Sequence, residues 1–385
     1  MIKKSLFSNP GHILPLDGVR GLAILLVIVE HGTHEAAMST KLTEWFRKLM
    51  VSGWIGVDLF FVLSGFLITG ILLRAKGKEG YFKNFYARRI VRIWPLYLFA
   101  VITALVIVPM VIAMRGTPDP TMETLLSKQR FIWLHSVNFG MFFYPVIFRQ
   151  AAVGVTHFWS LAVEEHFYLV WPFLVYLFSL KSLRKVCLLI IGLAFLARCV
   201  GVYLGLHPFY FTLTFCRFDA LAIGALLATF AHENTLEKLL PYAKWTAIAA
   251  AAILAAFFLK KRGLWPWHPF IFTVGLTLIA LGFGSLLVLT LHGPACLAAA
   301  FSTPFLLMCG RYSYGWYVID GILNSQMDSW FPWDRVVLVT GSREMATLSV
   351  LLLKALVSFV IAVAIWHSLE NPILKLKKHF SPRRS

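Results

Sequence analysis

The sequence predicts an all-α fold, a polytopic bundle of about ten membrane-spanning helices, on the basis of three observations. Hydrophobic residues make up 59% of the 385 residues and charged residues only 14%, whereas a soluble globular protein carries roughly 25% charged residues. The apolar residues gather in repeated blocks of roughly 17–25 residues, the length that crosses a bilayer core as a helix. The chain is also strongly basic, with 36 Lys and Arg against 18 Asp and Glu. Together these observations exclude an ordinary soluble enzyme.

Ten apolar blocks are long enough to cross a bilayer. They are Leu14–His34, Gly53–Leu73, Ile93–Met114, Phe158–Leu180, Val186–Leu204, Phe215–Phe230, Trp245–Leu259, Phe270–Leu291, Phe305–Met327 and Met345–Ser368. An even number of spans places both termini on one side of the membrane. The loops expected on that side carry the larger share of Lys and Arg, so the positive-inside rule predicts that both termini are cytoplasmic.

The stretch Phe131–Phe148 is apolar but is interrupted by Asn138, Gly140 and Pro145. We expect an interfacial or re-entrant element there, because non-helical backbone at membrane depth must be covered by protein. The apolar blocks leave no room for an appended soluble domain. We therefore expect one integral-membrane domain over residues 1–385. The net charge of +18 is explained by basic loops that orient the chain and contact anionic headgroups, and it does not indicate nucleic acid.

The first span, LDGVRGLAILLVIVEHG, contains ionisable residues that lipid would not tolerate. Such residues are costly in a membrane and are therefore functional candidates. Arg20 and His31 are eleven residues apart, which is about three turns plus 20° of helix, so they share one face about 16 Å apart. This places a cation and an imidazole inside the bundle. The alternative is that Arg20 reaches the headgroups along its stem while His31 sits at the outer interface.

The second and third spans add further charges. Asp58 lies early in the second span, GWIGVDLFFVLSGFLITG, and its partner is left open by the sequence. Arg89 and Arg92 precede the third span in FYARRIVRIWPLYL and share a helix face at a spacing of three. Two guanidinium groups one turn apart suit a polyphosphate. The alternative is a basic anchor that only sets topology.

Charged and aromatic residues in later spans are also candidates. Glu164, Glu165 and His166 are adjacent in FWSLAVEEHFYLVWP and point three ways on a helix. A desolvated carboxylate can act as a base or hold a histidine tautomer, and the alternative is a solvated end of the span. We assign five residues to substrate binding: Asp58 and Glu164, together with Arg217 and Asp219 in CRFDALAIGALLA and Tyr312 in RYSYGWYVID.

Seven segments occur in an order that resembles the membrane acyltransferase type 3 family, which includes O-antigen acetylases and macrolide acyltransferases. They are LDGVRGLAILL with its histidine, GVDLFFVLSGFLITG, FYARRIVRIWPLYL, FWSLAVEEHFYLVWP, RFDALAIGALLA, RYSYGWYVID and ENP. The resemblance covers residues 14–372, nearly the whole chain.

The resemblance implies a function and a set of site residues. Members carry an acyl group, often acetyl, from acyl-coenzyme A to a hydroxyl of a carbohydrate, a lipid-linked glycan or a small molecule. The resemblance implies that Arg20, His31 and Glu165 are the family's motif residues in this sequence. It also implies that Arg89 and Arg92 bind the coenzyme. We therefore expect an O-acyltransferase of the bacterial inner membrane that has His31 as general base, with Glu165 and Arg20 beside it, and uses no metal.

Three residues depart from the family pattern. His166 stands where glutamine is common, Asp320 where a histidine usually follows the aromatic run, and Glu30 where an apolar or aromatic residue often precedes the histidine. Acceptor contacts are therefore not transferred from the family. The competing hypothesis is a transporter or flippase that uses the same buried charges as a substrate or proton path. The sequence does not specify an oligomeric state.

Overall fold

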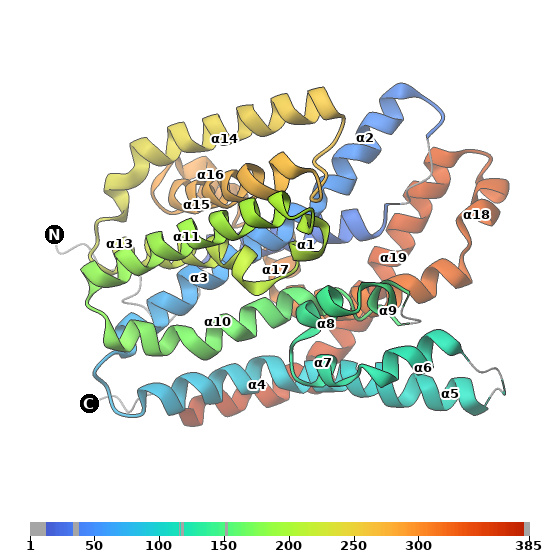
Figure 1. Ribbon diagram of the computed structural model, residues 1–385, viewed down its shortest axis with the longest axis horizontal. Coiled ribbons are helices and arrows are strands. Elements are labelled where there is room, and N and C mark those ends of the chain that lie inside the picture. Colours follow the sequence, from blue (N-terminus) through green and yellow to red (C-terminus); the bar gives the residue numbers. More distant parts are fainter. Residues whose placement is uncertain (1–12, 34–37, 115, 117–118, 151–152, 381–385) are drawn as a thin grey trace. The chain divides into compact units, whose positions relative to one another are not determined.

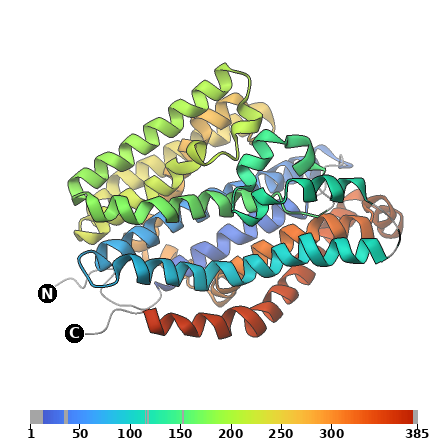
Figure 2. The ribbon, with the colours of Figure 1, turned by 60° about the horizontal axis from the view of Figure 1, so that its bottom comes forward.

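All of the secondary structure in the described part of the chain is helical (Figures 1 and 2). This computed structural model describes residues 13–33, 38–114, 116, 119–150 and 153–380. The long helices are α1 (Leu14–His31), α3 (Gly56–Ala75), α4 (Tyr81–Ile102), α10 (Phe158–Leu177), α11 (Leu180–Tyr203), α13 (Thr214–His232), α14 (Leu240–Lys261), α15 (Leu276–His292), α17 (Pro304–Trp330) and α19 (Arg343–Ile365). The all-α fold class is thus confirmed.

Short helices fill the connections. They are α2 (Lys41–Val51), α5 (Val108–Met114), α6 (Pro120–Ser127), α7 (Arg130–Trp133), α8 (Val137–Phe143), α9 (Pro145–Arg149), α12 (His207–Tyr210), α16 (Ala295–Ala300), α18 (Trp333–Thr340) and α20 (Asn371–Leu374). Three π-helical turns are η2 (Thr103–Ile107), η4 (Ile271–Gly275) and η5 (Trp366–Glu370). The predicted element at Phe131–Phe148 is built from α7, α8 and α9, so it is a series of broken helices.

Each of the ten predicted spans overlaps one of the long helices. Among the described residues, seven helical stretches are long and apolar enough to cross a membrane. They are Lys41–Ala75, Tyr81–Met114, Leu180–Tyr203, Thr214–His232, Leu236–Lys261, Ile271–His292 and Arg343–Phe380. The other three long helices are α1, α10 and α17. They are continuous, but the ionisable residues singled out above interrupt their apolar runs. The two termini, expected to be cytoplasmic, lie outside the described residues.

The chain divides into two compact units. Unit 1 comprises Met1–Val27, Trp54–Tyr81 and Val163–Arg311, and unit 2 comprises Ile28–Gly53, Phe82–Ala162 and Tyr312–Ser385. Several helices begin in one unit and end in the other. In particular, α1 ends with its last turn in unit 2, and α17 begins in unit 1 and continues into unit 2 from Tyr312.

Unit 1 is organised around α3 and α13, which pack on each other and on α15, while α11 lies against α13 and α14 against α15. A Cβ at Gly65 would lie 2.0 Å from the Leu221 carbonyl oxygen, and one at Gly224 would lie 2.0 Å from the Val62 carbonyl oxygen. Only glycine allows the two backbones to approach this closely. Lys76 directly follows α3. Its ammonium group donates hydrogen bonds to the carbonyls of Val175 and Phe178, and these bonds tie the end of α3 to the end of α10.

Unit 2 contains the end of α1, α4, most of α17 and α19, and the short helices around them. The Tyr314 hydroxyl on α17 donates to the Ile93 carbonyl on α4 at 2.7 Å. On the other side of α17, Trp316 Nε1 donates to Ser358 Oγ on α19 at 2.9 Å. These polar bonds, made inside an apolar bundle, hold α4, α17 and α19 in a fixed register.

Candidate functional site

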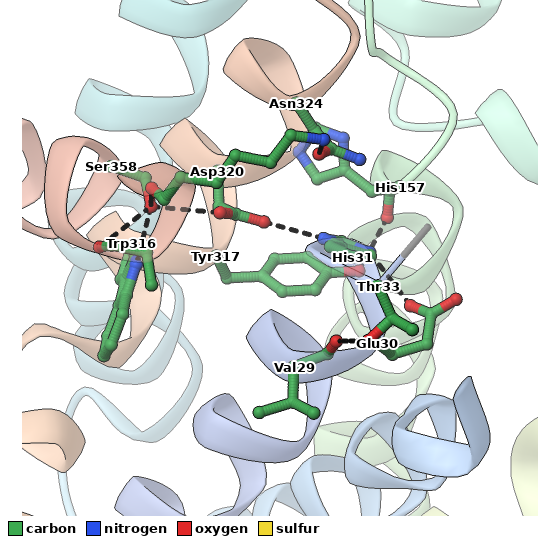
Figure 3. A network of polar contacts seen from close by, with 12 residues as sticks. Val29, Glu30, His31, Thr33, His157, Trp316, Tyr317, Asp320, Asn324 and Ser358 are labelled. Atoms are coloured by element: carbon green, nitrogen blue, oxygen red, sulfur yellow. Dashed lines mark hydrogen bonds and ion pairs between the residues drawn. The ribbon is translucent and has the colours of Figure 1, made fainter. Parts of the chain in front are cut away.

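The last residue of α1 is His31, and its imidazole lies beside a carboxylate from α17. His31 Nδ1 is 2.8 Å from Asp320 Oδ2. The Asp320 side chain is 5% exposed and the His31 side chain 22% exposed, so the pair is buried on the aspartate side and partly open on the histidine side. Figure 3 shows this pair at the centre of a polar network.

The network continues from Asp320 into α19. Asp320 Oδ1 accepts a hydrogen bond from Ser358 Oγ at 3.0 Å, and Ser358 also accepts from the Trp316 indole (Figure 3). Trp316 and Asp320 are four residues apart on α17 and therefore share a helix face. The carboxylate that touches the imidazole is thus itself held by a hydroxyl on a neighbouring helix.

The opposite nitrogen of the imidazole faces a second carboxylate. His31 Nε2 lies 3.5 Å from Glu30 Oε2, and the Glu30 side chain is 30% exposed. Figure 3 shows Glu30 on the side of the ring away from Asp320. The imidazole therefore lies between a buried carboxylate and a partly exposed one.

The surroundings of this pair in unit 2 are polar and tightly packed. The Lys354 ammonium on α19 donates to Asn324 Oδ1 at 2.7 Å and to Asp328 Oδ1 at 2.6 Å. His157, just before α10, lies over Gly321, where a Cβ would be only 2.3 Å from the imidazole ring. The Tyr317 hydroxyl donates to the His157 carbonyl at 2.9 Å.

Arg20 occupies the same helix as His31 but is engaged locally. Its Nη1 is 3.0 Å from Asp17 Oδ1, one turn earlier on α1. The pair is partly exposed. Arg20 therefore sits on the helix that carries His31, as the sequence predicts, with an acidic partner that the sequence analysis did not assign.

Arg89 and Arg92 lie in α4, within unit 2, and both are half-buried. Their spacing of three within a continuous helix confirms that they share a face. The Arg89 guanidinium is 6.0 Å from the centre of the Phe85 ring. The helix begins at Tyr81, earlier than the predicted span, so both arginines are presented on regular helix.

The three adjacent polar residues of α10 separate, as expected for consecutive positions on a helix. Glu164 accepts a hydrogen bond from the Tyr168 hydroxyl at 2.9 Å, and His166 Nδ1 lies 2.7 Å from Thr214 Oγ1. Glu165, which stands between these two residues in the sequence, is half-buried. All three belong to unit 1, whereas His31 belongs to unit 2, so a contact between Glu165 and His31 stays a prediction.

The remaining charged candidates pair with one another inside unit 1. Arg217 Nη2 lies 3.0 Å from both carboxylate oxygens of Asp58. Arg198 Nη1 lies 2.8 Å from Asp219 Oδ2, and Thr277 bridges the second pair. The structure thus supplies the partner of Asp58 that the sequence left open. A role for these residues in substrate binding stays a prediction.

Tyr312, the last candidate, lies near the start of the unit 2 part of α17. Its hydroxyl is 3.5 Å from His367 Nε2, and its ring packs edge-on against Phe359 and Trp366. Among the described residues, no cluster of three or more His, Cys, Asp or Glu is arranged to hold a metal ion.

Sequence reasoning noted Asp320 only as a departure from the family pattern and missed its contact with His31. The two residues are 289 positions apart, and no periodicity within one helix can indicate such a pairing. Ser358 and Lys354 were missed for the same reason. The available signal was that each is a polar residue inside an otherwise apolar span.

The chain matches a family described as "Acyltransferase domain" over residues 13–367. It belongs to the acyltransferase domain family. This membership confirms the resemblance identified from the seven segments.

Three curated relatives of this acyltransferase domain are named as O-acetyltransferases, two of them as putative ones. The peptidoglycan O-acetyltransferase OatA of Listeria monocytogenes is 28% identical over 381 residues, which cover 94% of this chain and 56% of that protein. The putative peptidoglycan O-acetyltransferase YrhL of Bacillus subtilis is 28% identical over 379 residues, covering 94% of this chain and 55% of that protein. A putative O-acetyltransferase of Staphylococcus aureus is 26% identical over 346 residues, covering 83% and 52%.

The acyltransferase domain thus spans about half the length of the curated relatives that it matches. No solved structure matches the chain.

Proposed function

We propose that this acyltransferase domain is a membrane O-acetyltransferase that moves an acetyl group from acetyl-coenzyme A to a carbohydrate hydroxyl. The observation that carries the proposal is the imidazole of His31, held 2.8 Å from the buried carboxylate of Asp320 at the end of a membrane helix. An imidazole with a carboxylate on one nitrogen has its other nitrogen available for proton transfer.

The donor is expected to bind through its phosphates. Arg89 and Arg92 offer two guanidinium groups on one face of α4, and guanidinium groups bind phosphate oxygens in bidentate fashion. With the positive-inside orientation, this end of α4 faces the cytoplasm, where acyl-coenzyme A is made. The pantetheine arm would then extend toward the reaction centre, with Arg20 on α1 as a further positive group along its course.

In the reaction, His31 acts as general base. It takes the proton from the acceptor hydroxyl while the hydroxyl oxygen attacks the carbonyl carbon of the thioester. The C–S bond then breaks, and the thiolate of coenzyme A takes the proton back from the imidazolium as it leaves. Glu165 is assigned a supporting role as a carboxylate that balances the imidazolium charge. That role rests on the family motif, since Glu165 and His31 belong to different units.

The acceptor is a hydroxyl-bearing glycan, and peptidoglycan is the first candidate because two relatives are named for its O-acetylation. A lipid-linked glycan is the alternative acceptor of the same chemistry. Glu164 and Tyr312 are proposed to contact it. The bacterial inner membrane is the location in which a cytoplasmic donor and a surface glycan can both reach one bundle of helices.

The test measures release of coenzyme A and acetylation of glycan strands by the purified chain in lipid nanodiscs. His31→Ala is expected to lower the turnover by about 10²–10⁴-fold, the usual contribution of a general base. His232→Ala, at the exposed end of α13, is the matched control and should retain wild-type turnover. Wild-type turnover in His31→Ala would remove His31 from the mechanism. A transporter has no reason to consume the thioester, so an absence of consumption would favour that class.

A further inference from the structure

The carboxylate of Asp320 fixes which nitrogen of His31 carries a proton. An ionised carboxylate only accepts hydrogen bonds, so the hydrogen at this contact belongs to His31 Nδ1, 2.8 Å from Asp320 Oδ2. In the neutral ring the other nitrogen, Nε2, then carries a lone pair. That nitrogen is the one on the Glu30 side of the ring, away from Asp320 (Figure 3).

Asp320 is itself braced by two further side chains. Its second oxygen, Oδ1, lies 3.0 Å from Ser358 Oγ, and the Trp316 indole donates to the same hydroxyl at 2.9 Å. The single proton of Ser358 has a second acceptor in the Lys354 carbonyl at 2.7 Å. Because an ionised carboxylate is the stronger acceptor, the arrangement favours donation to Asp320. The carboxylate is thus fixed by groups that leave Oδ2 for the imidazole.

We propose that Asp320 is the positioning residue of His31, which selects the tautomer with the lone pair on Nε2 and stabilises the imidazolium formed during transfer. The inference rests on the proposed role of His31 as general base. The acceptor O–H gives its proton to Nε2 as the new C–O bond forms and the C–S bond of the thioester breaks. The thiolate leaving group then takes that proton, and the charge on Asp320 offsets the intermediate imidazolium.

The charges that face His31 come from three elements. They are Glu30 on α1 itself, Asp320 on α17 and Lys354 on α19, and His157 lies near them just before α10. Two carboxylates favour the protonated imidazole, and the ammonium group opposes it. Asp320 is the one in hydrogen-bond contact, so removing its charge should change the protonation of His31 most.

The experiment follows His31 directly and does not depend on the acceptor. The full chain in lipid nanodiscs is treated with diethyl pyrocarbonate, which modifies neutral imidazole, and modification of the His31 peptide is measured by mass spectrometry across pH. Asp320→Asn keeps the size of the side chain and removes its charge. The midpoint of the pH profile should move to lower pH by about one unit or more, and kcat should fall by at least about 10-fold with KM for acetyl-coenzyme A unchanged.

Two further variants make the outcome decisive. Asp334→Asn removes an exposed carboxylate in the first turn of α18 and should change neither readout. Asp320→Glu keeps the charge but moves it, so its midpoint should stay near wild type while kcat falls. This second variant also decides the matter if Asp320→Asn fails to fold, because a purely structural residue would leave kcat of a folded Asp320→Glu unchanged.

The two proposals fail in different ways. An unchanged midpoint and kcat in Asp320→Asn would overturn the positioning role. Wild-type turnover in His31→Ala would overturn the proposed function, and the labelling profile would still measure the contact between His31 and Asp320. A shifted midpoint together with a lower kcat in Asp320→Asn, but not in Asp334→Asn, supports the positioning role.

Discussion

Four charged residues in unit 1 are buried almost completely and neutralise one another in two pairs. Asp58, Arg198, Arg217 and Asp219 are each at most 2% exposed. Their pairs are Asp58 with Arg217 and Arg198 with Asp219. An unpaired buried charge is far more costly than a satisfied pair. These residues therefore join α3, α11 and α13 by a contact in which every member depends on its partner.

We predict that Asp58 and Arg217 depend on each other for the stability of unit 1. Asp58→Ala leaves a buried guanidinium without its carboxylate and should lower the free energy of unfolding by about 3–5 kcal/mol. The double variant Asp58→Leu with Arg217→Met replaces the pair by apolar side chains and should recover most of that loss. Thermal unfolding in detergent measures both changes.

The double variant also separates two roles for this pair. If Asp58 and Arg217 only hold the helices together, acetyl transfer by the double variant should return together with stability. If they bind substrate, stability returns while KM for the acceptor stays raised. A double variant no more stable than Asp58→Ala would contradict the pairing itself.

At the scale of single residues, the sequence indicates which side chains matter better than it indicates their partners. Asp58 and Arg217 stand out because lipid disfavours charge, but they are 159 positions apart. Asp320 stood out only as an unusual residue after the aromatic run. A pairing between helices depends on how those helices pack, and helix packing is not encoded in the spacing within either helix.

At the scale of elements, the crossing of α3 and α13 depends on two glycines. Gly65 on α3 and Gly224 on α13 each lie where a Cβ would be 2.0 Å from a backbone oxygen of the partner helix. Backbone cannot move aside as the tip of a side chain can. Close approach of two membrane helices is a known use of small residues, and here it brings Asp58 within reach of Arg217.

We therefore predict that Gly224→Ala destabilises the protein. The added methyl group would clash with the Val62 carbonyl and with Phe66 N at 2.8 Å, and overpacking of this kind costs roughly 1–3 kcal/mol. Gly192→Ala on α11 is the control, because nothing lies within 4 Å of its added Cβ. It should leave stability unchanged or raise it by up to about 1 kcal/mol. Equal thermal stability of the two variants would show that the crossing tolerates a side chain.

The positions of the long helices were predictable because blocks of apolar residues report them directly. The beginnings and ends were less predictable. The helix that carries Arg89 and Arg92 starts at Tyr81, before the predicted third span, because the charged residues in its first turns are helical without being apolar. The short helix α2 was missed because it is amphipathic and holds Lys41, Glu44 and Lys48 among its eleven residues.

At the scale of the whole molecule, the candidate residues divide between the two units in a chemically meaningful way. Unit 2 contains His31, Asp320 and the two arginines of α4, whereas the buried charges of unit 1 are paired among themselves. Unit 2 thus holds the residues proposed for the donor phosphates and for the proton transfer. Arg20 and Glu165, which carry further proposed roles, belong to unit 1.

This division leads to a prediction about the side from which the donor enters. The positive-inside rule predicts that both termini are cytoplasmic. The arginine-bearing end of α4 would then face the inner side, and acetyl-coenzyme A should be used only from that side. In proteoliposomes with a single orientation, Arg89→Ala combined with Arg92→Ala should raise KM for acetyl-coenzyme A by about 10-fold or more, since each charge-assisted hydrogen bond contributes roughly 1.5–3 kcal/mol. The value of kcat should change little, because the arginines bind the donor equally in the ground and transition states.

The matched control is Lys83→Ala on the same helix, which removes one exposed positive charge nine residues before Arg92, on roughly the opposite face, and should leave KM near wild type. Because both variants reduce the positive charge at this end of α4, insertion must be checked by protease protection from each side. A raised KM in the double variant with correct topology assigns the arginines to the donor. An unchanged KM, or equal effects in Lys83→Ala, would mean that these residues only set the orientation of the chain.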